Sequence, residues 1–207
     1  MDSFFDSCVI LNYLEFFLYK NELRKRCSDY IDSNNGFLLC LYALKEIKGF
    51  INKREIQFNE VLKKIKNNSY KLGADRETEV LKKEELVYTE SLFEEFKALD
   101  VNILSKRFEN EISVMRLNLR IFLKNRIKEF VIKEDEINKS LADILHEFLD
   151  KYGDCRILAS ALQAQQEREE FIFVTSDKHF NENEYAFIEG EPRLKDYKFP
   201  KLKNLLY

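Results

Sequence analysis

Four acidic residues occupy comparable places in this sequence, each beside the end of a predicted strand or the start of a predicted helix. They are Asp6, Glu46, Asp154 and Asp177. Carboxylates that converge repel one another and take up protons unless a cation neutralises them, so a cluster of this kind predicts a divalent ion. Ligation by oxygen alone, with no Cys or His pair nearby, favours Mg²⁺ or Mn²⁺ over Zn²⁺. The four acids therefore predict a metal centre, provided that the fold brings them together.

Taken one at a time, the same acids have simpler interpretations. Asp6 and Asp177 are suited to turns or helix N-caps, and Asp154 is suited to an N-cap. Glu46 is suited to the solvated face of a helix. Only the four acids together favour a metal centre. Whether they meet depends on the strands and helices that position them.

Strands and helices alternate near the N-terminus. Residues 4–5 form a short apolar run before Asp6, after which apolar residues recur with helical spacing. The segment NNG at 34–36 predicts a turn, and residues 37–41 have the length of a buried strand. The helix that follows carries Glu46 on its first turns.

The C-terminal part repeats this pattern. The segment FIFVT at 171–175 predicts a strand that is followed by Asp177. The helix before it is expected to begin at Gly153, with Asp154 as its N-cap, and to run to Gln166. Such units form a parallel sheet covered by helices on both faces. Because the carboxyl ends of parallel strands line one crevice, acids just beyond them can converge from distant parts of the sequence.

The middle of the chain, about residues 55–137, is predicted to be an all-helical insertion. Apolar residues recur there at every third or fourth position, no strand pattern is convincing, and Gly73 is the only breaker. We expect one helix over 77–99, a second over 101–133 that is either continuous or broken, and a further helix over 138–151 that returns to the sheet.

The composition favours one folded domain rich in helix. The chain has 207 residues, of which 45% are apolar and 34% charged, with only five Gly and two Pro. This argues against a turn-rich sandwich or barrel. The four Cys residues form no C-x-x-C pair and are expected to be buried thiols in a reducing cytoplasm. No signal peptide or membrane span is expected, which predicts a cytoplasmic protein without a membrane partner.

Four segments carry a resemblance to a known family. They are FFDSCVILNYLE around Asp6, LYALKEI around Glu46, GDCRILASAL around Asp154 and FVTSDKHF around Asp177. In order and spacing they resemble the PIN-domain (PilT N-terminus-like) family of metal-dependent nucleases. The resemblance covers roughly residues 1–52 and 138–183. The family sometimes carries a further acid two positions after the last Asp, where this chain has His179.

The resemblance implies a fold and a domain organisation. The fold would be a three-layer α/β/α arrangement around a central parallel sheet of four to five short strands. Residues 1–207 would form a single PIN-like domain, with a core of about 1–54 and 138–207 and the helical insertion at about 55–137.

The resemblance also implies a metal-dependent endonuclease, most naturally an endoribonuclease that hydrolyses RNA phosphodiester bonds. Toxins of toxin–antitoxin pairs and RNA-processing enzymes both fit. Asp6 and Asp177 would ligate Mg²⁺ or Mn²⁺ directly, Asp154 would ligate it or hold a coordinated water, and Glu46 would be an outer ligand or would orient the attacking water. The partners would be RNA rather than DNA, an antitoxin or other protein, and a second copy of the chain. The alternative is a non-catalytic PIN-fold assembly factor that binds nucleic acid or protein.

Three further residues near the last acid have open roles. Thr175 and Ser176 either donate hydrogen bonds to the neighbouring carboxylates or only end the strand. His179 is expected to pack or to contact a phosphate, in preference to donating a proton, and His146 is expected to be structural.

Any nucleic-acid partner must be held by a local basic patch, because the net charge is −3. One candidate repeats every four residues along one face of the predicted helix 101–133, and could follow a phosphate backbone. Its residues are Arg116, Arg120, Lys124 and Lys128. The alternative is a solvated face, or one paired with the acidic helix 77–100. A second group is closer to Glu46 in sequence and consists of Lys45, Lys48, Lys53 and Arg54.

Overall fold

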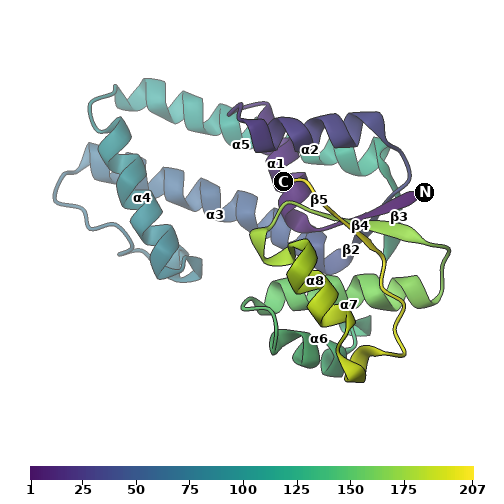
Figure 1. The fold of residues 1–207 in the computed structure, drawn as a ribbon. Coiled ribbons are helices and arrows are strands. Elements are labelled where there is room, and N and C mark those ends of the chain that lie inside the picture. Colours follow the sequence, from purple (N-terminus) through teal and green to yellow (C-terminus); the bar gives the residue numbers. More distant parts are fainter. The chain divides into compact units, whose positions relative to one another are not determined.

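The computed structural model describes residues 1–207 as an α/β fold (Figure 1). The chain divides into two compact units. The sheet unit comprises Met1–Ile47 and Leu119–Tyr207, and the helical unit comprises Lys48–Asn118. Two long helices, α3 (Leu41–Lys66) and α5 (Val101–Asn125), contribute residues to both units.

The sheet unit is built on five parallel strands in the order β3-β2-β1-β4-β5. Phe4 in the central strand lies opposite Leu38 on one side and Phe173 on the other. The predicted parallel sheet is therefore confirmed. The strands are β1 (Asp2–Phe5), β2 (Phe37–Cys40), β3 (Ile127–Val131), β4 (Phe171–Thr175) and β5 (Lys201–Asn204).

The sequence explains which strands are central. All four residues of β2 are buried, and β1 and β4 are buried apart from one residue each. A continuous apolar run of this kind is typical of a parallel strand covered on both faces. The outer strands β3 and β5 instead carry exposed charges such as Glu129 and Lys201, which suits strands with one free edge.

Aromatic rings fill the core of the sheet unit. Phe5 packs on Phe37 with 4.7 Å between ring centroids, and Phe122 stacks on Phe37 at 6.3 Å. Helix α1 packs against α2 and β4, and α7 packs against α6 and β2. The helices that lie wholly in this unit are α1 (Ser7–Phe16), α2 (Glu22–Ser33), α6 (Lys139–His146), α7 (Tyr152–Gln166) and α8 (Glu182–Glu189).

The helical unit has a small aromatic core of its own. Phe58 of α3 and Phe108 of α5 stack with 3.9 Å between centroids, and Phe96 meets Phe108 edge-on at 5.6 Å. Phe96 ends α4 (Lys83–Phe96), which follows a short 3₁₀ helix at Arg76–Val80. None of the helices in the chain combines the length and the apolar run that crossing a membrane requires.

The structure corrects four sequence-based boundaries. The predicted helix 77–99 is instead a 3₁₀ helix at Arg76–Val80 followed by the shorter α4 at Lys83–Phe96. The predicted helix 101–133 is wrong beyond Asn125, because residues 127–131 form strand β3, so the stretch 55–137 is not entirely helical. Its apolar spacing continues without Gly or Pro, but its backbone pairs with β2, a long-range contact that local propensity does not encode. Helix α6 ends at His146 instead of residue 151. Helix α7 begins at Tyr152, so Asp154 lies in its first turn and is not its N-cap.

Candidate metal centre

The candidate site lies at the carboxyl ends of the central strands. From β1 the sheet extends through β2 to β3 on one side, and through β4 to β5 on the other. The gap between β1 and β4 is therefore the point where the strand order reverses, which is where open parallel sheets bind ligands. Asp6 directly follows β1, and Asp177 follows β4 by two residues.

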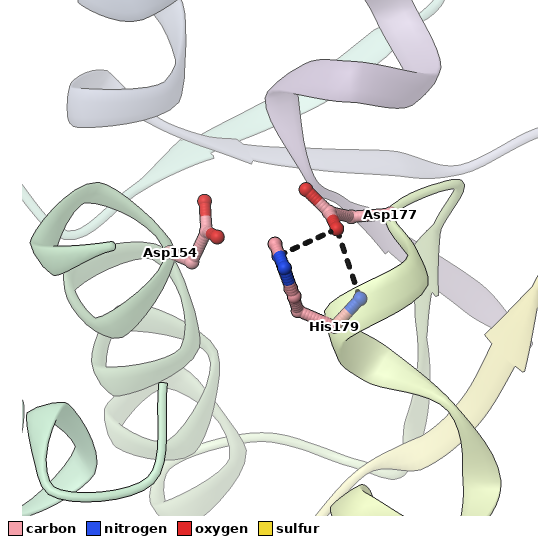
Figure 2. A group of neighbouring side chains, drawn as sticks. All are labelled: Asp154, Asp177 and His179. Carbon is pink, nitrogen blue, oxygen red and sulfur yellow. Dashed lines mark hydrogen bonds and ion pairs between the residues drawn. The ribbon is translucent and has the colours of Figure 1, made fainter. Parts of the chain in front are cut away.

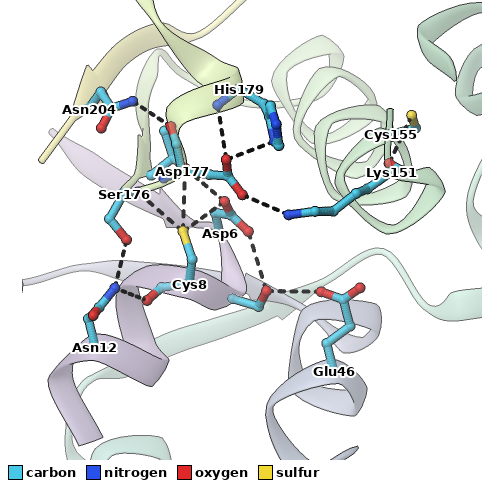
Figure 3. Close-up of polar contacts among 12 residues, drawn as sticks. Asp6, Cys8, Asn12, Glu46, Lys151, Cys155, Ser176, Asp177, His179 and Asn204 are labelled. Atoms are coloured by element: carbon cyan, nitrogen blue, oxygen red, sulfur yellow. Dashed lines mark hydrogen bonds and ion pairs between the residues drawn. The ribbon is translucent and has the colours of Figure 1, made fainter. Parts of the chain in front are cut away.

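Asp6 is buried beneath the site, with 2% of its surface exposed. Its Oδ2 accepts hydrogen bonds from Thr175 Oγ1 at 2.7 Å and from Cys8 Sγ at 3.0 Å (Figure 3). Burial raises the pKa of Asp6 above its ordinary value, and these donors offset only part of the rise. Thr175 thus contacts a carboxylate, whereas Ser176 Oγ accepts from Asn12 Nδ2 at 3.1 Å.

Asp177 is held by the loop that follows β4. Its Oδ1 accepts the backbone N–H of His179 at 2.9 Å, and its Oδ2 lies 3.3 Å from Lys151 Nζ. Burial alone would raise the pKa of Asp177, but the His179 N–H and the Lys151 ammonium outweigh it and lower the pKa below its ordinary value. Asn204 of β5 fixes this loop by donating to the carbonyl oxygens of Asp177 and Phe180 at 2.7 and 3.0 Å.

Glu46 reaches the site from the second turn of α3. Ser7 Oγ donates to Glu46 Oε2 at 2.9 Å and lies 3.4 Å from Asp6 Oδ1, so this hydroxyl links the two acids. Burial raises the pKa of Glu46. A Cβ at Gly153 would overlap Glu46 Oε1, so any other residue there would displace the end of the Glu46 side chain from its present position.

Asp154 is the least compensated of the four acids. Its Oδ2 is buried and has no hydrogen-bond partner. Burial, followed by the charge of Asp6, raises the pKa of Asp154 to about 7, and Lys151 offsets this only in part. A buried carboxylate without a donor is costly. It is the feature expected where a cation is missing from a charge balance.

The side chains of Asp154, Asp177 and His179 meet in one place (Figure 2). One potential ligand atom from each lies within 4.8 Å of the other two. His179 Nδ1 is buried and lies 3.0 Å from Asp177 Oδ1 in an ion-pair contact, although it makes no hydrogen bond (Figure 2). The residues present therefore fit a divalent ion, with oxygen and nitrogen donors and one buried carboxylate oxygen, Asp154 Oδ2, that has no partner.

The structure thus brings the four predicted acids to one edge of the sheet. Asp154 and Asp177 belong to the closest group, while Asp6 and Glu46 adjoin it through Thr175 and Ser7. Sequence reasoning missed three contributors to this edge, namely Ser7, Lys151 and the close approach at Gly153. Only Ser7 had a signal, since a hydroxyl next to a candidate ligand is a common hydrogen-bond donor to it.

The structure retains only part of the basic helix face that the sequence predicts. Lys128 lies in β3 and not on a helix, and its Nζ pairs with Asp2 at 2.7 Å. Arg116 pairs with Glu55 of α3 at 2.6 Å, not with the acidic segment 77–100. Arg120 and Lys124 are on α5 as predicted, and both are exposed.

The second basic group is largely engaged in pairs. Lys45 pairs with Glu134 at 2.8 Å, and Lys53 pairs with Glu85 at 2.9 Å. Arg54 stacks over the ring of Tyr88, with 4.8 Å to the centroid. Lys48 is exposed.

No protein-family model, curated protein or solved structure matches this chain. A function must therefore be argued from the residues of the site and their geometry.

Proposed function

We propose that this chain is a PIN-type endoribonuclease that depends on Mg²⁺ or Mn²⁺. The observation that carries the proposal is the meeting of four acids at the strand-order reversal, where Asp154 Oδ2 is buried without a partner. A three-layer arrangement is supported by Figure 1, which draws α1 and α2 on one side of the sheet and α6 and α7 on the other.

The acids divide into two groups by their surroundings. Asp177 has a lowered pKa and Asp154 has an unpartnered oxygen, so these two are the strongest candidates to hold the ion directly. Asp6 is proposed as the third ligand, through the oxygen that Thr175 and Cys8 leave open. Glu46 is proposed as an outer ligand or as the acid that orients the attacking water.

A divalent ion at this site would acidify a water and polarise a phosphoryl oxygen. The chain's own groups supply the rest. Ser7 and Thr175 fix the carboxylates of Glu46 and Asp6 by donating hydrogen bonds. Lys151, whose side chain is 59% exposed, carries a positive charge at the rim where a substrate phosphate would arrive. Asp177 stays ionised at neutral pH, because its pKa is lowered.

RNA is proposed as the substrate because of the resemblance to PIN-domain nucleases. The exposed side chains of Lys48, Arg120 and Lys124 are proposed to contact the phosphate backbone. The other basic residues predicted to contact RNA already have acidic or aromatic partners within the chain, so we expect them to contribute less to RNA binding.

The test is cleavage of a single-stranded RNA pool by the purified chain in Mn²⁺ or Mg²⁺. We expect metal-dependent cleavage that a chelator abolishes. Asp177→Asn and Asp6→Asn should each reduce the rate by about 10³-fold, because an ion contributes several kcal/mol of transition-state stabilisation. Asp196→Asn, at an exposed acid, is the matched control and should cleave normally.

The melting temperature separates loss of function from loss of fold. It should rise or stay within a few degrees in Asp6→Asn, because burial raises the pKa of Asp6, and should fall by no more than a few degrees in Asp177→Asn, whose lowered pKa marks a stabilised charge. Wild-type chain that binds metal but cleaves neither RNA nor DNA would overturn the nuclease and favour the non-catalytic assembly factor.

A further inference from the structure

His179 is a half-buried group at the site whose role the carboxylates do not explain. It lies in the short 3₁₀ helix Lys178–Phe180 after β4, with 26% of its side chain exposed. Its Nδ1 is buried and makes no hydrogen bond. This edge of the ring faces the Asp177 carboxylate, with Nδ1 3.0 Å from Oδ1, so the two form an ion-pair contact when the ring is protonated and present two adjacent ligand atoms when it is neutral.

The distance between His179 and Asp177 fits two ligands of one ion. Ligands that lie about 2.1 Å from an ion and at right angles to each other are about 3 Å apart. Nδ1 and Asp177 Oδ1 are separated by 3.0 Å without a hydrogen bond between them. The backbone N–H of His179 also holds Oδ1, so one tight turn fixes both atoms.

A third ligand atom faces this pair from another element. Asp154 comes from the first turn of α7, and one of its carboxylate oxygens lies within 4.8 Å of a ligand atom from each of the other two residues (Figure 2). The two buried side-chain atoms that make no hydrogen bond, Asp154 Oδ2 and His179 Nδ1, thus come from residues of the same small group.

We propose that His179 is a nitrogen ligand of the metal centre and gives the site a preference for Mn²⁺ over Mg²⁺. Mg²⁺ is held almost entirely by oxygen, whereas imidazole nitrogen suits transition metals. The proposal rests on the metal centre of the proposed function. It also replaces the sequence-based expectation of ligation by oxygen alone.

The chain is well suited to a direct test, because it contains only two His residues. The other, His146, is engaged through Nδ1 with the carbonyl oxygen of Leu149 at 3.0 Å. Pulsed electron paramagnetic resonance of the Mn²⁺-loaded chain should detect hyperfine coupling to a histidine nitrogen. His179→Asp should abolish this coupling while keeping an oxygen ligand, and His146→Gln should retain it.

Calorimetric titration with each ion gives a second readout. In His179→Asp the ratio of Mn²⁺ to Mg²⁺ affinity should fall by about tenfold or more, since even indirect ligand partners alter metal affinity by this amount. His179→Ala should weaken Mn²⁺ binding further, and His146→Gln should leave the ratio unchanged.

The outcomes separate the two proposals. Wild-type chain that binds neither ion overturns the metal centre itself. Binding of Mn²⁺ without nitrogen coupling, or with a ratio unchanged in His179→Asp, overturns only the role of His179. Loss of cleavage in His179→Ala with Mn²⁺ affinity intact would instead assign the ring to proton transfer or to a substrate phosphate.

Discussion

Buried carboxylates occur in both units of the chain, and their surroundings differ sharply. In the helical unit, Glu60 is 1% exposed and each of its oxygens has donors. It accepts from Tyr70 Oη at 2.8 and 3.0 Å, from the Gly73 N–H at 2.9 Å and from Lys63 at 3.2 Å. This carboxylate ties the loop after α3 to the helix, and nothing further is needed to balance its charge.

The four acids of the candidate site in the sheet unit lack this full compensation. Four carboxylates share the charge of Lys151, and Asp154 Oδ2 has no partner. Asp6, Glu46 and Asp154 all have raised pKa values, with burial as the main cause. Burial with full compensation indicates a structural role, whereas burial without it indicates a site that awaits a charged ligand.

The largest expected effect on stability comes from the compensated carboxylate. Glu60→Ala should lower the free energy of unfolding by about 3 kcal/mol, because it leaves the Tyr70 hydroxyl and the Gly73 N–H without their partner. Urea denaturation measures this change. Glu109→Ala is the control, since this exposed residue of α5 only accepts from Ser105 at 3.0 Å. A cost for Glu60→Ala no larger than that of the control would contradict the structural role.

The sequence predicted the centre of the fold well because burial leaves a local signal. The runs of β2 and β4 are apolar almost throughout, β1 ends in two Phe residues, and an acid follows both β1 and β4 within two residues. The rule that parallel strands present their carboxyl ends together was enough to expect Asp6 and Asp177 at one edge of the sheet.

The edges of the sheet could not be predicted in the same way. The segments IKEFV of β3 and KLKN of β5 are short and mix apolar with charged residues, so their strand character depends on pairing with a neighbour. The same limit applies to the site. Lys151 and Gly153 matter because α7 lies against Asp177 and Glu46, and that is a tertiary contact without a local pattern.

A smaller effect on stability is expected when the charge of Asp154, the uncompensated acid, is removed. The pKa of Asp154 is raised to about 7, from 3.8, so the folded chain keeps a proton that the unfolded chain releases between about pH 4 and 7. The stability that this residue contributes therefore falls as the pH rises through that window and is constant above it. The lowered pKa of Asp177 acts with the opposite sign, below pH 4.

Asp154→Asn isolates this contribution. Without metal, the variant should match the wild type near pH 4 and exceed its stability by about 1 kcal/mol at pH 8, which is about 3 °C in melting temperature. Saturating Mn²⁺ should reverse the order, because only the wild type keeps the full ligand set. A wild type that is the more stable of the two at pH 8 without metal would show that Asp154 is compensated after all.

The smallest effect is expected at the one cation of the cluster. Lys151→Met removes a positive charge 3.3 Å from Asp177 Oδ2, so the site becomes more negative and should bind Mn²⁺ about threefold more tightly in calorimetric titration. The effect is small because the ammonium is largely exposed and screened. Lys128→Met is the matched control, since Lys128 pairs with Asp2 at the opposite end of β1 with 57% of its side chain exposed. Weaker Mn²⁺ binding in Lys151→Met but not in Lys128→Met would mean that Lys151 positions Asp177 for the ion. The acids of the site would then differ from Glu60 only in how far their charge is compensated.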